Sequence, residues 1–200
     1  AKHLDAGKSA RTFEVSSDDA ELIATADLLS LKPIIYAANM DEDGFAHYED
    51  NKYFQSVRDL AAREGAQVLP ICAKLEQDIA ELDDPEERAM FLADLGIEKS
   101  GLDRLIQCSY DLLGLISFLT DGKKECRAWT IRKGTKAPQA AGKIHSDFER
   151  GFIRASVIGY NDLEANNFDY AAVKAKGLQR TEGKEYVVND GDVIEFLFNV

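Results

Sequence analysis

The sequence has few cysteines and no long hydrophobic run. Its three cysteines, Cys72, Cys108 and Cys126, are an odd number without a close pair, which excludes a disulfide framework and a Cys-x-x-Cys metal site. We expect buried thiols in a protein of the reducing cytoplasm. No apolar stretch approaches the roughly 20 residues of a membrane-spanning helix, and we expect neither a secretory leader nor a membrane partner.

Composition and charge favour a folded protein with two different halves. The 200 residues are 45% hydrophobic and 9% aromatic, which is enough to bury a core and excludes a disordered chain. The net charge of −12 is unevenly spread. Residues 1–116 carry 11 Lys and Arg against 24 Asp and Glu, a balance of −13, whereas residues 117–200 carry 13 against 12, a balance of +1. An acidic half followed by a locally basic half predicts two domains with different partners.

A turn after the first hydrophobic strand gives the strongest indication of a ligand. The strand is predicted over residues 33–38, and Asn39-Met40-Asp41-Glu42 follows it. P-loop GTPase folds read a purine base at such a strand end, and the guanine-specific turn has the pattern Asn-Lys-x-Asp. Met40 replaces the Lys and Glu42 replaces the Asp, so the turn fits a nucleotide base but departs from the guanine pattern. The alternative is a solvated acidic loop that caps the next helix.

A second turn is predicted where a parallel strand ends beside the first. Residues 51–63 have apolar side chains at helical spacing, and Gly65 ends this helix. The apolar residues 68–72 then predict a second strand. Strand, helix and strand of this length form a right-handed βαβ unit, and open α/β sheets bind ligands at the carboxyl ends of such strands. The turn that follows, Cys72-Ala73-Lys74, resembles the Ser-Ala-Lys turn that closes over the base in GTPases.

Caps, breakers and hydrophobic spacing predict the remaining elements. In the first half we expect helices over residues 16–30, 75–82, 85–95 and 102–113. Residues 115–122 are interpreted as the joint between the domains. In the second half we expect four short strands and two helices, which together predict a small α+β domain. The strands are expected over residues 126–131, 152–158, 185–188 and 193–198, and the helices over residues 137–148 and 168–176.

Two long motifs make the chain recognisable. They are RAWTIRKGTKAPQAAGKIHSDFERGF over residues 127–152 and NDGDVIEFLFNV over residues 189–200. Both resemble the YchF / Obg-like ATPase family, and the resemblance covers essentially the whole chain. It implies an α/β fold, the end of a P-loop GTPase-like parallel sheet with helices, followed by an α+β TGS domain of β-grasp (ubiquitin-like) shape. The implied boundaries are the end of a helical (coiled-coil) insertion at 1–30, the carboxyl-terminal part of a nucleotide-binding G domain at 31–116, and the TGS domain at 117–200.

The resemblance also implies a nucleotide. Intact family members bind and hydrolyse ATP in preference to GTP, and the family carries Asn-x-x-Glu at the base turn. A carboxylate on a guanine edge accepts hydrogen bonds from its N1–H and amino group, whereas the unprotonated N1 of adenine repels it, so loss of Asn-Lys-x-Asp relaxes the selection of guanine. The implied base contacts come from Asn39, Met40, Glu42, Cys72, Ala73 and Lys74.

The phosphate-binding loop Gly-x4-Gly-Lys-[Ser/Thr] does not occur in the 200 residues. Gly7-Lys8-Ser9 imitates its end but has no preceding strand, and Asp41-Glu42-Asp43-Gly44 imitates the Asp-x-x-Gly magnesium motif at the wrong place in the chain. We therefore expect no catalytic residue and no metal ligand in this chain, and no nucleotide hydrolysis by it alone. Magnesium is expected in the intact protein, held by residues outside this chain.

Nucleic acid is the second expected partner. Residues 123–154 hold nine basic and three acidic side chains, and such a run with aromatic residues between the charges fits contacts to RNA or the ribosome. The candidate contacts are Arg127, Arg132, Lys133, Lys136 and Lys143. The alternatives are an ordinary solvated face with core aromatics, or a stand-alone TGS-type RNA-, ribosome- or protein-binding module without nucleotide chemistry. His145 is interpreted as structural, and we expect a monomer.

Overall fold

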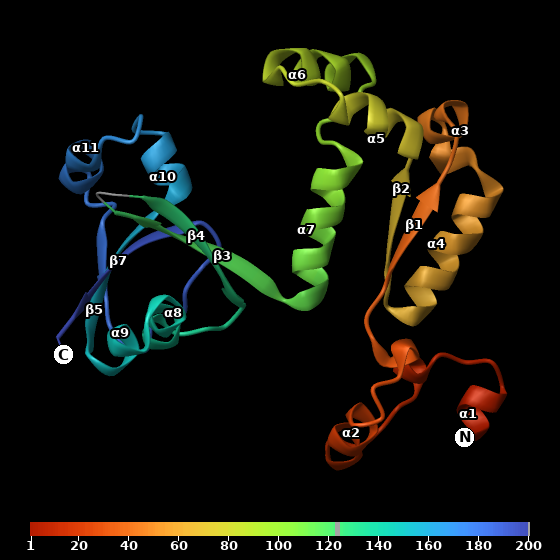
Figure 1. Ribbon diagram of the computed structural model, residues 1–200, viewed down its shortest axis with the longest axis horizontal. Coiled ribbons are helices and arrows are strands. Elements are labelled where there is room, and N and C mark those ends of the chain that lie inside the picture. The colour runs from red at the N-terminus through yellow and green to blue at the C-terminus, as the bar shows by residue number, and fades with distance from the viewer. Residues whose placement is uncertain (123–124, 200) are drawn as a thin grey trace. The chain divides into compact units, whose positions relative to one another are not determined.

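The computed structural model describes residues 1–122 and 125–199, apart from the side chain of Asp18 (Figure 1). The chain divides into two units, Ala1–Leu112 and Leu113–Val200. Within the described residues, none of the helices has the length and apolar character that crossing a bilayer requires. The fold is mixed α/β, because the first unit has a small parallel sheet and the second a larger mixed sheet.

The first unit begins with short helical segments: α1 (Lys2–Asp5), the 3₁₀ turn η1 (Ala10–Thr12), α2 (Ser17–Ala24) and the 3₁₀ turn η2 (Leu29–Leu31). Ser16 caps α2, since its hydroxyl accepts a hydrogen bond from the backbone N–H of Asp19. The predicted helix over residues 16–30 is wrong in its length. It ends at Ala24 because the chain turns there, and Asp27 adopts a left-handed φ of 43°.

A βαβ unit forms the centre of the first unit. The strands β1 (Ile35–Asn39) and β2 (Gln67–Ile71) are parallel, and α4 (Lys52–Glu64) connects them and packs against them. Asn51 caps α4 by accepting from the backbone N–H groups of Tyr53 and Phe54, and Gly65 ends it with a left-handed φ of 65°. The predicted βαβ unit is therefore confirmed. The short α3 (Glu42–Ala46) and the 3₁₀ turn η3 (Tyr48–Asp50) lie between β1 and α4.

Three helices complete the first unit: α5 (Ala73–Ala80), α6 (Pro85–Asp94) and α7 (Gly101–Leu113). Glu76 of α5 ties α5 to the start of α7. Its Oε1 accepts from the backbone N–H of Gly101 at 2.7 Å, and its Oε2 accepts from that of Leu102 at 3.2 Å. These are two of the N–H groups that the first turn of a helix leaves without an intrahelical partner.

The second unit is built on a five-stranded sheet in the order β4-β3-β7-β5-β6. Its strands are β3 (Leu115–Asp121), β4 (Cys126–Arg132), β5 (Phe152–Gly159), β6 (Arg180–Glu182) and β7 (Asp192–Phe198). The neighbours β3 and β7 run parallel, and the other neighbours are antiparallel. The helices are α8 (Ala137–Ile144), α9 (Ser146–Arg150), α10 (Tyr160–Glu164) and α11 (Tyr170–Ala175).

The two faces of this sheet bury different clusters. Val157 and Ile194 lie in a larger cluster with the alanines of α8, whereas their neighbours Ile158 and Val193 lie in a smaller one with Leu163 of α10 and Val173 of α11. Successive residues of a strand face opposite sides, so α8 covers one face, and α10 and α11 cover part of the other. Figure 1 shows these helices on the two sides of the sheet.

Several sequence predictions for the second unit are wrong. Residues 115–122 do not form a joint, because β3 is a central strand and its Phe118 is completely buried. The segment 185–188 makes one isolated bridge, between Val187 and Lys136, in place of a strand, and the short β6, which was not predicted, pairs with β5. The helix expected over residues 137–148 breaks at His145, which is extended and whose Nδ1 accepts from the backbone N–H of Asp147 to cap α9.

The three thiols are free, but they are not all buried. Cys72 is buried, Cys108 is half-buried and Cys126 is exposed. The expectation of buried thiols is therefore wrong for Cys126, which begins the edge strand β4.

Candidate functional site

The two predicted base turns meet at the carboxyl ends of β1 and β2. Asn39 is the last residue of β1, and its Oδ1 accepts a hydrogen bond from the backbone N–H of Ala73 at 3.0 Å. The backbone N–H of Met40 donates to the carbonyl of Ile71 at 2.9 Å. One side-chain bond and one backbone bond thus join the turns across the end of the parallel pair, where open α/β sheets bind their ligands.

A charged pair closes the same edge. Lys74 Nζ donates to Glu42 Oε1 at 2.6 Å, and both side chains are exposed. The hydrogen bond to Glu42 is the largest cause of a raised pKa of Lys74. The Glu42 carboxylate, which stands where a guanine-specific turn has its Asp, is therefore directed to a cation of the neighbouring turn.

A hollow of about 420 Å³ opens between the turns. All six residues that the sequence predicts as base contacts line it, together with Asp41 and Asp43. Cys72 is only 2% exposed, so little of this residue is open to the hollow. Sequence reasoning named no role for Asp41 or Asp43 in this hollow, although their place inside the turn was a signal for one.

The acidic side chains of this edge do not build a metal site. Asp41 Oδ1 accepts from the backbone N–H of Gly44 at 2.8 Å, which makes Asp41 the cap of α3. The sequence Asp41-x-x-Gly44 thus forms the start of α3. Across the described residues, the structure contains no group of three or more His, Cys, Asp or Glu side chains that could hold a metal ion.

The predicted nucleic-acid residues are only partly brought together in the second unit. Arg132 and Lys143 line one groove of about 580 Å³ along β4 and α8, with the polar side chains of Thr135 and Gln139. Lys136 lies outside this lining and pairs with Glu185.

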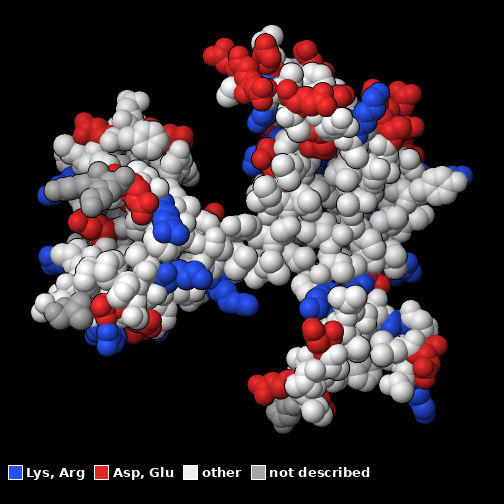
Figure 2. Space-filling model, in the orientation of Figure 1, with Lys and Arg blue, Asp and Glu red and all other residues white. Residues whose placement is uncertain are grey.

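Arg127 and Lys133 also lie outside the lining of the groove. The Arg127 guanidinium stacks over the ring of Trp129 at 4.3 Å, and Lys133 is exposed in the turn after β4. Lys123 and Lys124, also part of the predicted basic run, lie outside the described residues. In contrast, Figure 2 shows acidic side chains gathered over α6 of the first unit.

Comparison with known proteins decides the family. The family model YchF-GTPase_C, whose description is "Protein of unknown function (DUF933)", matches residues 115–199. The ribosome-binding ATPase YchF of Bacillus subtilis (strain 168) is 52% identical over 197 residues, which are 98% of this chain and 53% of that protein. The chain belongs to the YchF family. It spans about half the length of the curated relatives it matches and corresponds to their carboxyl-terminal portion.

Two further relatives support this assignment. The ribosome-binding ATPase YchF of Escherichia coli O157:H7 is 51% identical over 190 residues, covering 95% of this chain and 51% of that protein. The solved structure of the Schizosaccharomyces pombe YchF GTPase superposes with a TM-score of 0.80 at 35% identity, over 98% of this chain and 52% of that one. A GTP-binding protein of Pyrococcus horikoshii OT3, at 18% identity and a TM-score of 0.59 over 98% of this chain and 55% of that one, shares the fold.

Proposed function

We propose that this chain supplies the base-recognition turns of the nucleotide site in a YchF-type ATPase, together with a domain that contacts the ribosome or RNA. The hydrogen bond from the Ala73 backbone to Asn39 Oδ1 carries the first part of this proposal. It fixes the two turns at one edge and leaves a lined hollow between them. The relatives named ribosome-binding ATPase support both parts.

The preference for ATP over GTP rests on the Glu42–Lys74 pair. Guanine recognition needs a carboxylate that accepts from N1–H and the amino group of the base. Lys74 binds the Glu42 carboxylate at 2.6 Å, so guanine has to compete with this cation for the carboxylate. Adenine makes no hydrogen bond to the carboxylate, so the ion pair does not weaken its binding. Asn39 Oδ1 keeps one lone pair for the adenine amino group, because a carbonyl oxygen accepts two hydrogen bonds.

We propose that the second unit is a TGS domain of β-grasp shape. A β-grasp sheet numbered from its own first strand has the order 2-1-5-3-4, and the observed order β4-β3-β7-β5-β6 corresponds to it. We retain 1–30 for the end of a helical insertion, and for the expected G domain (31–116) and TGS domain (117–200) we propose a boundary near residue 113, because a boundary after residue 116 would divide β3. A role on the ribosome implies a cytoplasmic location.

Hydrolysis belongs to the intact protein in this proposal. The 200 residues contain no Gly-x4-Gly-Lys-[Ser/Thr] motif, and the residues that hold magnesium lie outside them. We therefore expect weak nucleotide binding and no hydrolysis by this chain alone, since contacts to the phosphates are missing.

Titration calorimetry of the chain with ATP and with GTP tests the base site. We expect ATP to bind more tightly than GTP, and Asn39→Ala to abolish the difference by removing the proposed acceptor for the adenine amino group together with the bond to Ala73. Asn161→Ala, an exposed change in the second unit, serves as the matched control. Equal binding of both nucleotides, or binding of neither, contradicts the proposed preference.

Co-sedimentation with purified Bacillus subtilis ribosomes tests the second part. Binding should weaken steeply with salt, and the pair Arg132→Glu and Lys143→Glu should reduce it and flatten the salt dependence by about one unit of slope per lost phosphate contact. The pair Lys174→Glu and Lys184→Glu changes the charge equally outside the groove and is the control. Ribosome binding without nucleotide binding would favour the alternative, a stand-alone binding module.

A further inference from the structure

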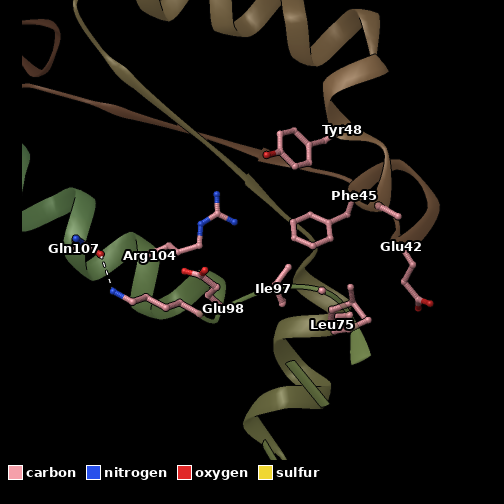
Figure 3. Close-up of a pocket in the computed structure, with 12 residues that line it drawn as sticks. Glu42, Phe45, Tyr48, Leu75, Ile97, Glu98, Arg104 and Gln107 are labelled. Carbon is pink, nitrogen blue, oxygen red and sulfur yellow. Dashed lines mark hydrogen bonds between the residues drawn. The ribbon is translucent and has the colours of Figure 1, made fainter. Parts of the chain in front are cut away.

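A second hollow, of about 580 Å³, lies in the first unit beside the base turn (Figure 3). Its walls come from α3, η3, α5, the segment 95–99 and α7. Ligand pockets in proteins have volumes of about 300–1,000 Å³, mostly apolar walls and a few convergent polar groups. This hollow has the same composition, and neither Asn39 nor Ala73 lines it.

Apolar and aromatic side chains form one side. Phe45 and Tyr48 contribute rings whose centroids are 6.3 Å apart and whose planes are tilted by 33°. Leu75 and Ile97 face the same space, and Figure 3 shows these four side chains grouped opposite α7. A flat ring lying against these side chains would gain contact with two aromatic side chains and two aliphatic ones.

Cationic and amide groups form the other side. Lys99 Nζ donates to Gln107 Oε1 at 3.3 Å, which holds the ammonium group beside the middle of α7. The Arg104 guanidinium points toward the space in front of Tyr48 and Phe45 (Figure 3). Within the described part of the chain, no carboxylate forms an ion pair with it. A guanidinium beside an apolar wall favours a planar anion that accepts two of its N–H groups.

The carboxylates around the hollow do not satisfy this arginine. Glu42 lines the edge, but Lys74 already binds it at 2.6 Å. Glu98 is exposed at the rim and makes no ion pair among the described residues. The lining itself holds two cations, Lys99 and Arg104, and two carboxylates, Glu42 and Glu98, whereas residues 1–116 as a whole carry 11 basic and 24 acidic side chains. Because Lys74 engages Glu42 and no ion pair engages Arg104 among the described residues, the Arg104 guanidinium is the group left to bind an anion.

We propose that this hollow binds a small aromatic carboxylate. The ring would lie against Phe45, Tyr48, Leu75 and Ile97, and the carboxylate would accept from Arg104, with Lys99 as the second cation. The carboxyl-terminal Phe or Tyr of a peptide has this chemistry. The proposal does not depend on the nucleotide function, because the ligand would contact none of the six residues that we propose as base contacts.

An NMR titration of the ¹⁵N-labelled 200-residue chain with N-acetylphenylalanine tests the proposal. We expect saturable shifts of amide signals around the hollow, at Phe45, Ile97 and Arg104. N-acetylphenylalanine amide has the same ring but no charge, and we expect it to bind about tenfold more weakly. Shifts confined to other parts of the chain, or equal binding of the acid and the amide, would overturn the proposal.

Variants test which residues bind the carboxylate of the ligand and which bind its ring. Arg104→Gln should weaken binding of the acid about tenfold and leave binding of the amide unchanged. Arg63→Gln replaces an exposed arginine of α4 outside the hollow and should change neither. Phe45→Ala should weaken both ligands. Circular dichroism establishes whether each variant is folded. If Phe45→Ala does not fold, the result for Arg104→Gln alone tests the proposal. Undiminished binding of the acid to Arg104→Gln would refute the site.

Discussion

Replacing Glu76 should destabilise the first unit selectively. Its carboxylate accepts from two backbone N–H groups at the start of α7, at 2.7 and 3.2 Å. Leu102 is 61% exposed, so water can replace the bond to its N–H, whereas Gly101 is buried and its N–H would lose its partner. A hydrogen bond to a charged group contributes about 1.5–3 kcal/mol, and we expect Glu76→Ala to lower the free energy of unfolding by about 2 kcal/mol.

Urea unfolding with two probes measures this effect. Trp129 is the single tryptophan and lies in the second unit, so its fluorescence reports on that unit, whereas far-ultraviolet circular dichroism is dominated by the long helices α4 and α7 of the first. The circular dichroism midpoint should fall in Glu76→Ala and fall less in Glu76→Gln, which keeps an acceptor without the charge. The fluorescence midpoint should not move.

A matched control and a clear refutation are available. Asp78 is an exposed carboxylate of the same helix α5, and Asp78→Ala should change the stability by less than about 0.5 kcal/mol. If Glu76→Ala left the circular dichroism transition unchanged, the two hydrogen bonds of the carboxylate to the start of α7 would not contribute to the stability of the first unit. If the fluorescence transition fell equally, the effect would not be confined to the first unit.

Three further predictions concern single groups. Tyr186→Phe removes the bond from Tyr186 Oη to the buried Asp192 at 2.7 Å and should cost about 1–2 kcal/mol in urea unfolding followed by tryptophan fluorescence; an unchanged midpoint would contradict this. Burial and the hydrogen bond to Asp121 raise the pKa of Tyr170 to about 12, above its ordinary value of 10.0, so the stabilisation is present below pH 10 and should be lost as the pH rises toward 12. This loss should be smaller in Tyr170→Phe, as measured by urea midpoints across that pH range. Gly65→Ala places a side chain at a φ of 65°, where no other atom lies near its Cβ. The free energy of unfolding should therefore fall by about 1 kcal/mol for conformational reasons alone, as measured by the circular dichroism transition. An unchanged transition would contradict the left-handed cap.

The βαβ unit was predictable because its signals are local. Asn51 and Gly65 mark the two ends of α4 by their side-chain chemistry, and each strand is a short apolar run beside a turn. Parallel strands place their carboxyl ends together, so the meeting of the turns after Asn39 and Ile71 also follows from the sequence. The sequence does not predict the two side-chain contacts between the turns, because they depend on the register of the strands. These contacts are the hydrogen bond from Ala73 to Asn39 and the ion pair of Lys74 with Glu42.

The errors in the second unit have physical causes too. The segment 115–121 buries Ile116 and Phe118 on one face, but the opposite face mixes Leu115 and Leu119 with Ser117, which blurs the alternation that identifies a half-buried strand. The strand β6 has only three residues, too few for any pattern. The groove that Arg132 and Lys143 share, and the hollow beside Arg104, depend on how helices pack, which residue spacing alone does not determine.

A ¹⁵N NMR titration of this chain with ATP and with GTP tests the central claim most directly. If the turns after β1 and β2 form a purine site without a preference for guanine, ATP should shift the amide signals of Met40 and Ala73 and saturate at a lower concentration than GTP. Shifts at neither amide, or tighter binding of GTP, would contradict the account.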